Sequence, residues 1–128
     1  MPHKLKFRQL PGTYAIVRLA SDAAIPAWAT KGEFTSITRT ADELSVVCPT
    51  ENVPLEIHFP LRWISLKLEG PFPFSQTGVL LSFIRPLSEK EIPIFAISTF
   101  DTDYVLIPKD HIGAAMDILR EASHEIIY

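Results

Sequence analysis

The sequence predicts a mixed α+β fold in which helices pack on one face of antiparallel sheets. Three observations carry this prediction: several short stretches have the composition of strands, two stretches have apolar residues at helical spacing, and one order of elements occurs twice. The chain has 128 residues, of which 47% are hydrophobic and 21% charged, so it can bury a core. Eleven prolines against five glycines indicate short elements with sharp ends and argue against a long helical bundle.

The first half of the chain consists mainly of predicted strands. Lys4 to Leu10 alternates polar and apolar residues, as a short edge strand does. A short helix is expected to begin near Ser21, with Pro26 limiting its length. Prolines make residues 50–60 mostly irregular. Alternating, β-branched or apolar stretches predict further strands at 14–19, 34–40 and 44–48.

The second half combines strands with two helices. The first helix is expected from Thr77 to about Leu87, kinked or restarted at Pro86. The nearly continuous apolar run from Ile92 to Thr99 predicts a strand buried on both faces. An amphipathic helix is expected over residues 110–122, with Asp110 as its N-cap. Two further strands are expected at 63–68 and 104–107.

An internal repeat organises these elements. At a shift of 60 positions, the two strands of the first hairpin align with those of the second: residues 37–40 with 97–100, and 44–47 with 104–107. At a shift of 50, an earlier strand also aligns, residues 16–19 with 66–69. A chance likeness between two hairpins is the alternative, and the shared order of elements argues against it. The order β-α-β-β thus occurs twice, and each copy begins a ferredoxin-like βαββαβ unit. The difference between the shifts predicts a helix about three turns longer in the second copy.

We therefore expect two ferredoxin-like units, residues 1–62 and 63–128, packed together because each is small for a core of its own. The N-terminal strand, Lys4 to Leu10, either completes the sheet of the second unit or pairs across a dimer. Both units are expected to have antiparallel sheets with helices on one face.

Composition and spacing exclude several functions. The net charge of −3 gives no basic surplus for binding nucleic acid. No run approaches 18 apolar residues, so no membrane span is expected. The N-terminus lacks an apolar signal core, and the single cysteine, Cys48, cannot form an intramolecular disulfide, so we expect a cytoplasmic protein. The four histidines are isolated in sequence, so neither a metal nor a cofactor is expected.

The loop at residues 69–78 joins a strand to the start of a helix. Unpaired backbone N–H groups and the helix dipole there favour an anion such as an α-carboxylate. Gly78 has no side chain, so a ligand can approach the backbone. The alternative is a plain loop in which Ser75 or Thr77 caps the helix. Phe72 and Phe74 of this loop either cover a small pocket and exclude water, or staple the loop to the core.

An acidic pair lies in the turn between the last two paired strands. Asp101 and Asp103 can accept hydrogen bonds from a cationic group, either an α-ammonium or a guanidinium. An Asx-turn, in which each side chain bonds its own backbone, would explain both residues equally, and the two roles can coexist. The hydroxyls of Ser98 and Thr99 either reach a ligand along the strand edge or face solvent.

The second half also resembles a known family. Its stretch IPIFAISTFDTDYVLIP, preceded by Thr77-Gly78-Val79-Leu80, is similar to ACT-domain proteins of the tandem type related to the CASTOR-type arginine sensors. Regulatory domains of aspartate kinases are more distantly similar. The resemblance covers residues 13–125 and departs from the family pattern at Lys90-Glu91, where a small residue is commoner. It implies two ACT-type units that bind a small effector, typically an amino acid, at their interface.

The loop, the turn and the resemblance together define a set of candidate ligand-binding residues. These are Phe74, Ser75, Thr77, Gly78, Val79, Ile97, Ser98, Thr99, Phe100, Asp101 and Asp103. We expect a regulatory module without catalytic activity that binds a free amino acid or a similar small effector and acts through a homodimer or a partner protein. The main alternative is a structural or protein-interaction module with a degenerate pocket and an exposed sheet edge. A third hypothesis is a small enzyme that uses Cys48 or the acidic pair.

Overall fold

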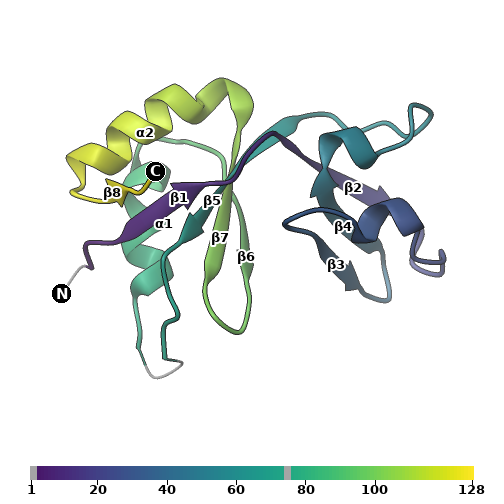
Figure 1. Ribbon diagram of the computed structural model, residues 1–128, viewed down its shortest axis with the longest axis horizontal. Helices are drawn as coiled ribbons and strands as arrows, with labels where there is room; N and C mark the ends of the chain where they lie inside the picture. Colours follow the sequence, from purple (N-terminus) through teal and green to yellow (C-terminus); the bar gives the residue numbers. More distant parts are fainter. Residues whose placement is uncertain (1–2, 74–75) are drawn as a thin grey trace. The chain divides into compact units, whose positions relative to one another are not determined.

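The computed structural model describes residues 3–73 and 76–128, so the candidates Phe74 and Ser75 lie outside the described residues. The chain has a mixed α+β fold, which confirms the predicted class (Figure 1). It divides into two compact units. We call Gly12–Trp63 the inserted unit, and Ile64–Tyr128 with the N-terminal residues up to Pro11 the helical unit. No helix in the described ranges is long and apolar enough to cross a bilayer.

The helical unit contains the βαββαβ order that the sequence predicts for the second half. Its sheet has the strand order β6-β7-β5-β1-β8, and both helices belong to this unit (Figure 1). The strands and helices are β1 (Lys6–Gln9), β5 (Arg62–Leu68, whose first two residues fall in the inserted unit), α1 (Val79–Glu89), β6 (Phe95–Ser98), β7 (Asp103–Pro108), α2 (Ile112–Glu121) and β8 (Glu125–Ile126).

The N-terminal strand β1 lies inside this sheet. It pairs with β5 antiparallel, Phe7 opposite Leu68, and with β8 in parallel, Phe7 opposite Ile126. Leu5 and Phe7 alternate with exposed lysines and are buried under the helices. Of the two places that the sequence left open for this strand, the structure therefore shows the sheet of the second half. The predicted division after residue 62 assigns the strand to the first half instead.

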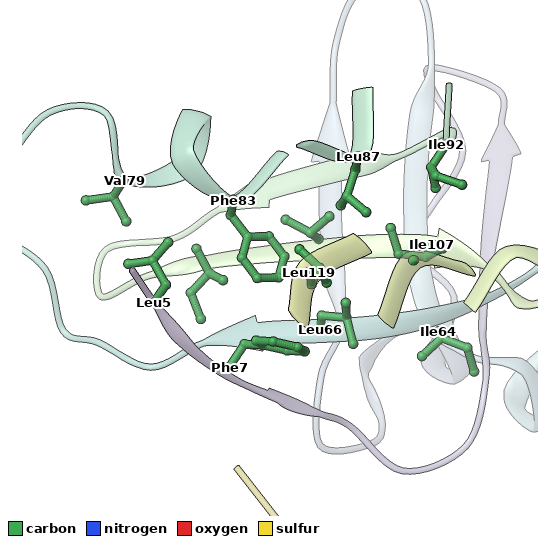
Figure 2. Packing of buried hydrophobic residues seen from close by; sticks show 13 residues of the cluster. Leu5, Phe7, Ile64, Leu66, Val79, Phe83, Leu87, Ile92, Ile107 and Leu119 are labelled. Atoms are coloured by element: carbon green, nitrogen blue, oxygen red, sulfur yellow. The ribbon is translucent and has the colours of Figure 1, made fainter. Parts of the chain in front are cut away.

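The core of the helical unit lies between one face of the sheet and the two helices. Every second residue of β5 faces it, and so do buried positions of α1 and α2 (Figure 2). Phe83 of α1 is fully buried, and its ring meets that of Phe7 edge-on at 5.2 Å between centroids. The buried members are Leu5, Phe7, Ile64, Leu66, Leu68, Val79, Phe83, Leu87, Ile92, Val105, Ile107, Ala115 and Leu119.

Helix α1 runs through Pro86 without restarting. Proline has no N–H to donate to the carbonyl four residues earlier, which is that of Ser82. The Nε2–H of His124 donates to this Ser82 carbonyl at 2.9 Å, while His124 Nδ1 accepts the Leu5 N–H at 3.1 Å. Both ring nitrogens are thus satisfied when the imidazole is neutral. Burial of the ring, which is 4% exposed, lowers the pKa of His124.

Two expectations about the second half are wrong. The apolar run from Ile92 to Thr99 is a strand only over Phe95–Ser98, with residues alternately half-buried and exposed. The reason is that β6 is an edge strand, which pairs with β7 alone among the described strands. Asp110 does not cap the last helix, because it lies in a 3-10 turn, Lys109–His111, and α2 begins at Ile112.

The inserted unit is a small antiparallel sheet with two 3-10 turns. Its elements are β2 (Tyr14–Leu19), η1 (Ala27–Thr30), β3 (Ser36–Arg39), β4 (Leu44–Pro49) and η2 (Thr50–Asn52). The strand order is β3-β4-β2, and Tyr14 and Ala15 also pair with Trp63 and Arg62 at the start of β5. The expected helix near Ser21 instead forms after Pro26, as η1, because proline suits the position before a helical turn. The buried core of the inserted unit consists of Ala15, Val17, Ala29, Leu44, Val46, Cys48 and Val53.

The two hairpins of the repeat have the same turn. Arg39 pairs with Leu44 in the first and Ser98 with Asp103 in the second, so equivalent residues are 59 positions apart, one fewer than the predicted shift. In both turns the first residue is a threonine whose N–H and hydroxyl donate to the carbonyl of the fourth. The predicted shift was off by one because β-branched and apolar residues occur on both faces of these strands, and a slip of one exchanges the faces.

Candidate functional site

A cavity of about 320 Å³ lies in the helical unit where the β5–α1 loop meets the β6–β7 turn. Two hydrogen bonds join this loop and turn. The Phe72 N–H donates to the Asp101 carbonyl at 3.0 Å, and the Thr102 hydroxyl donates to the Leu68 carbonyl at 2.8 Å. The described residues lining it are Phe72, Pro73, Gln76, Gly78, Val79, Leu80, Ser98, Thr99, Phe100, Asp101, Thr102 and Asp103.

Most of the described candidate residues meet at this cavity. Thr77 and Ile97 do not line it: Thr77 lines a second cavity, and Ile97 pairs with Tyr104 inside the β6–β7 hairpin. Seven candidates do line it, namely Gly78, Val79, Ser98, Thr99, Phe100, Asp101 and Asp103. Phe72, expected either to cover a pocket or to staple the loop to the core, lines the cavity and also packs against the core. Four other lining residues are outside the candidate set, although each directly neighbours a candidate: Pro73, Gln76, Leu80 and Thr102.

One side of the cavity is the start of helix α1. Gly78 adopts a left-handed conformation, φ +77° and ψ 4°, and helical geometry begins at Val79. Within the described residues no side chain caps this helix, so Thr77 does not have the capping role that the plain-loop alternative gave it. The first amides of a helix lack intrahelical acceptors and carry partial positive charge. Those of Val79 and Leu80 therefore make this side favourable for an anion.

The opposite side is the β6–β7 turn with its two carboxylates. Thr99 shapes this turn, since its hydroxyl donates to the Thr102 carbonyl at 3.0 Å. Asp103 accepts a hydrogen bond from the hydroxyl of Ser98, while Asp101 is exposed at the rim. The described lining contains no lysine, arginine or histidine. The turn therefore favours a cationic group, just as the helix start favours an anionic one.

Other groups considered for chemistry lie elsewhere. Cys48 is fully buried in the inserted unit, and burial raises the pKa of its thiol to about 11 with a smaller contribution from Glu51, which leaves it protonated at neutral pH. Glu69, at the end of β5, accepts a hydrogen bond from Arg8 Nε at 2.6 Å, which lowers the pKa of that carboxyl. Across residues 3–73 and 76–128, no three His, Cys, Asp or Glu side chains gather as a metal site would require.

A second cavity, of about 510 Å³, lies beside the first and shares Gly78 with it. It opens between the N-terminal residues, the start of α1 and the end of α2. Its described lining comprises His3, Thr77, Gly78, Leu81, Ser82, Arg85, Pro86, Glu89, Ala122 and His124. Thr77 lines only the second cavity, whereas Gly78 lines both.

Gly70 holds the loop close to the turn, so we expect Gly70→Ala to be destabilising. A Cβ there would lie 3.0 Å from the Asp101 carbonyl oxygen and 3.2 Å from Phe72 N, and the crowding should lower the free energy of unfolding by about 1–2 kcal/mol. Gly113→Ala is the matched control, because nothing lies within 4 Å of its Cβ position in α2; it should stabilise by up to about 1 kcal/mol. Urea unfolding measures both, and equal stability of Gly70→Ala and wild type would contradict the expectation.

Comparison with known proteins agrees with this architecture. Residues 59–121 match the family model of the ACT domain, and residues 12–56 match a model for an N-terminal domain. The fold and this match define the second half as an ACT domain. A solved structure of protein Atu0741 from Agrobacterium tumefaciens is 43% identical, covers 98% of this chain and 93% of its own, and superposes with a TM-score of 0.92. The chain therefore belongs to the same family as Atu0741.

More distant relatives match part of the chain or its fold. The mouse protein "Cytosolic arginine sensor for mTORC1 subunit 1" is 36% identical over 59 residues, 45% of this chain and 18% of that protein. Human CASTOR3P is 28% identical over 93 residues, 62% of this chain and 57% of its own length. VC0802 from Vibrio cholerae, 16% identical with a TM-score of 0.76 over 94% of this chain and 91% of its own, shares the fold. This chain thus spans about a fifth of the length of the arginine sensors that it matches.

Proposed function

We propose that this protein is a regulatory module that binds a free α-amino acid in the 320 Å³ cavity of its ACT domain. The observation that carries the proposal is the opposite polarity of the two sides of the cavity. The amides of Val79 and Leu80 suit the α-carboxylate of the ligand, and the carboxylates of Asp101 and Asp103 suit its ammonium group. The volume lies at the lower end of the range for small-molecule sites.

Arginine is the first amino acid to test. Several relatives that match 45% of this chain are named as arginine sensors, and a guanidinium group pairs well with carboxylates and with aromatic faces. The two aspartates and the aromatic ring of Phe100, which is 79% exposed at the rim, offer both kinds of partner. These groups also suit the ammonium group that every amino acid carries, so the test covers all twenty.

The inserted unit is part of the same proposal, as a reduced ferredoxin-like unit. Its elements occur in the order β2, η1, β3, β4, η2 and the start of β5, which is the βαββαβ order with 3-10 turns in place of the two helices. The ligand binds where the ACT domains of two copies of the chain meet, and the exposed Phe100 is the side chain that the second copy would cover. The protein acts in the cytosol, as the name of the sensor relatives says of them, through a homodimer or a partner protein.

The proposal is tested by thermal unfolding with each of the twenty amino acids at millimolar concentration, followed by calorimetry. Ligands that bind only the folded protein stabilise it, by about 2.7 kcal/mol at 100 times Kd. We expect at least one amino acid to raise the Tm. For arginine, agmatine lacks the carboxylate and Nα-acetylarginine lacks the ammonium group, so both should bind at least tenfold more weakly. If no amino acid shifts the Tm, the proposal fails and the interaction-module alternative is favoured.

A further inference from the structure

We infer that His3 is a positioning residue for the amino-acid cavity, which it serves from outside by fixing the start of helix α1. The inference rests on the proposed function for its effect on affinity. Its structural part stands on three contacts of His3 with the loop and the first turn of the helix. His3 lines the second cavity and is absent from the described lining of the first.

The imidazole of His3 contacts the three residues that precede helix α1, residues 76–78. Its Nε2–H donates to the Thr77 carbonyl at 2.9 Å, and its Nδ1 accepts a longer hydrogen bond, 3.4 Å, from the side-chain amide of Gln76. These partners correspond to the neutral tautomer with the proton on Nε2. Its ring atoms also lie 3.9–4.0 Å from the Cβ position of Gly78. The ring therefore contacts residues 76–78 from the second cavity, and two of these residues, Gln76 and Gly78, also line the ligand cavity.

The backbone of His3 also forms a hydrogen bond with helix α1. Its N–H donates to the hydroxyl of Ser82 at 2.9 Å, and that hydroxyl donates to the Gly78 carbonyl at 2.8 Å. Helix α1 has no capping side chain in the described residues, so these contacts restrain its first turn where a cap would otherwise do so. The amides of Val79 and Leu80 belong to this turn. A site whose binding groups are fixed in advance loses less entropy when the ligand binds.

The N-terminal strand keeps His3 in place. Leu5, two residues further on, donates its N–H to His124 Nδ1 at 3.1 Å and accepts the N–H of Glu125 at 2.9 Å. Through Leu5, His3 is thus anchored to the segment between α2 and β8 and to β8 itself, and it connects them with the ligand loop. Because coupling between two sites is reciprocal, ligand binding should in turn protect the N-terminal strand.

The structural part is tested by amide hydrogen exchange of the ligand-free protein. We expect His3→Ala to accelerate exchange about tenfold at residues 82–84, whose amides bond to the carbonyls of residues 78–80, with α2 unchanged. The side-chain hydrogen bonds of His3 to residues 76 and 77 are lost, while the backbone bond to Ser82 remains. His3→Gln, whose side-chain amide can donate where Nε2–H does, should restore most of the protection. Lys4→Ala is the matched control, since Lys4 is the exposed neighbour in the same segment. Unchanged exchange in His3→Ala would overturn the inference.

The functional part is tested by calorimetry with L-arginine, or with the amino acid that gives the largest Tm shift in the screen. We expect Kd to rise about tenfold in His3→Ala and to return close to wild type in His3→Gln. Equal Kd values for His3→Ala and wild type, with a binding wild type, would overturn the positioning role. If the wild type binds no amino acid while exchange responds as expected, the proposed function fails and the structural part of the inference stands.

Discussion

Gly78→Asp is expected to weaken amino-acid binding at least roughly 100-fold, because opposing like charges cost several kcal/mol, while the protein stays folded. Aspartate tolerates a left-handed backbone better than most residues, and the nearest atoms to the Cβ position of Gly78 are those of the His3 ring, 3.9–4.0 Å away. The new side chain would leave the backbone on the side of the His3 ring, and its carboxylate would add a negative charge at the start of α1. That charge would offset the partial positive charge of the helix amides and repel the ligand carboxylate.

Gly78→Asn is the control for this substitution, because asparagine has the same shape and the same tolerance of positive φ without the charge. It should keep a substantial part of the affinity. Calorimetry gives Kd for both variants, and thermal unfolding checks that both are folded. Binding of Gly78→Asp with the wild-type Kd would show that the ligand carboxylate does not lie at the helix start.

Acid is expected to destabilise the ACT domain through His124. Burial lowers the pKa of His124 below its ordinary value of 6.5, so below about pH 6.5 the unfolded chain takes up a proton that the folded protein does not bind. Stability is then lost as the pH falls, by up to about 1.4 kcal/mol per pH unit, until the pH reaches the lowered pKa. A proton on Nδ1 would face the Leu5 N–H and break that hydrogen bond.

The measurement is the free energy of unfolding from urea titrations between pH 7.5 and 5. His124→Gln removes the titrating group, so its stability should be lower at pH 7.5 but change less with pH than that of the wild type. His111→Gln removes an exposed histidine and should keep the wild-type dependence. Parallel profiles for wild type and His124→Gln would show that another group causes the acid loss.

The sequence was most informative where one local pattern determines the structure. Alternation and amphipathic spacing located most strands and both helices of the second half, because burial on one face selects the period of apolar residues. The cavity could be anticipated for a similar reason. A glycine before a helix and an acidic turn after an edge strand are local features, and the βαββαβ order brings the two together at Gly78 and Asp101.

Local patterns say nothing about partners that are distant in the chain. The alternation of Leu5 and Phe7 indicates a strand but not that it pairs with both β5 and β8. His3 and His124 looked isolated because their partners are 74 and 42 residues away, at Thr77 and Ser82. The sequence predicts that Pro86 kinks or restarts the helix. The helix continues because the Ser82 carbonyl, which Pro86 cannot bond, accepts from His124, and only the tertiary structure supplies that donor.

The position of β1 has a consequence for the order in which the chain can fold. This strand is synthesised before both of its partners, since β5 begins at Arg62 and β8 at Glu125. Its sheet therefore closes last, through contacts of long sequence separation that slow folding, while the inserted unit between them is already complete. A fragment cut at the ACT match, residues 59–121, would lack both β1 and β8. The side of β5 that pairs with β1 would then be an exposed edge, open to aggregation, while β7 would still pair with the other side.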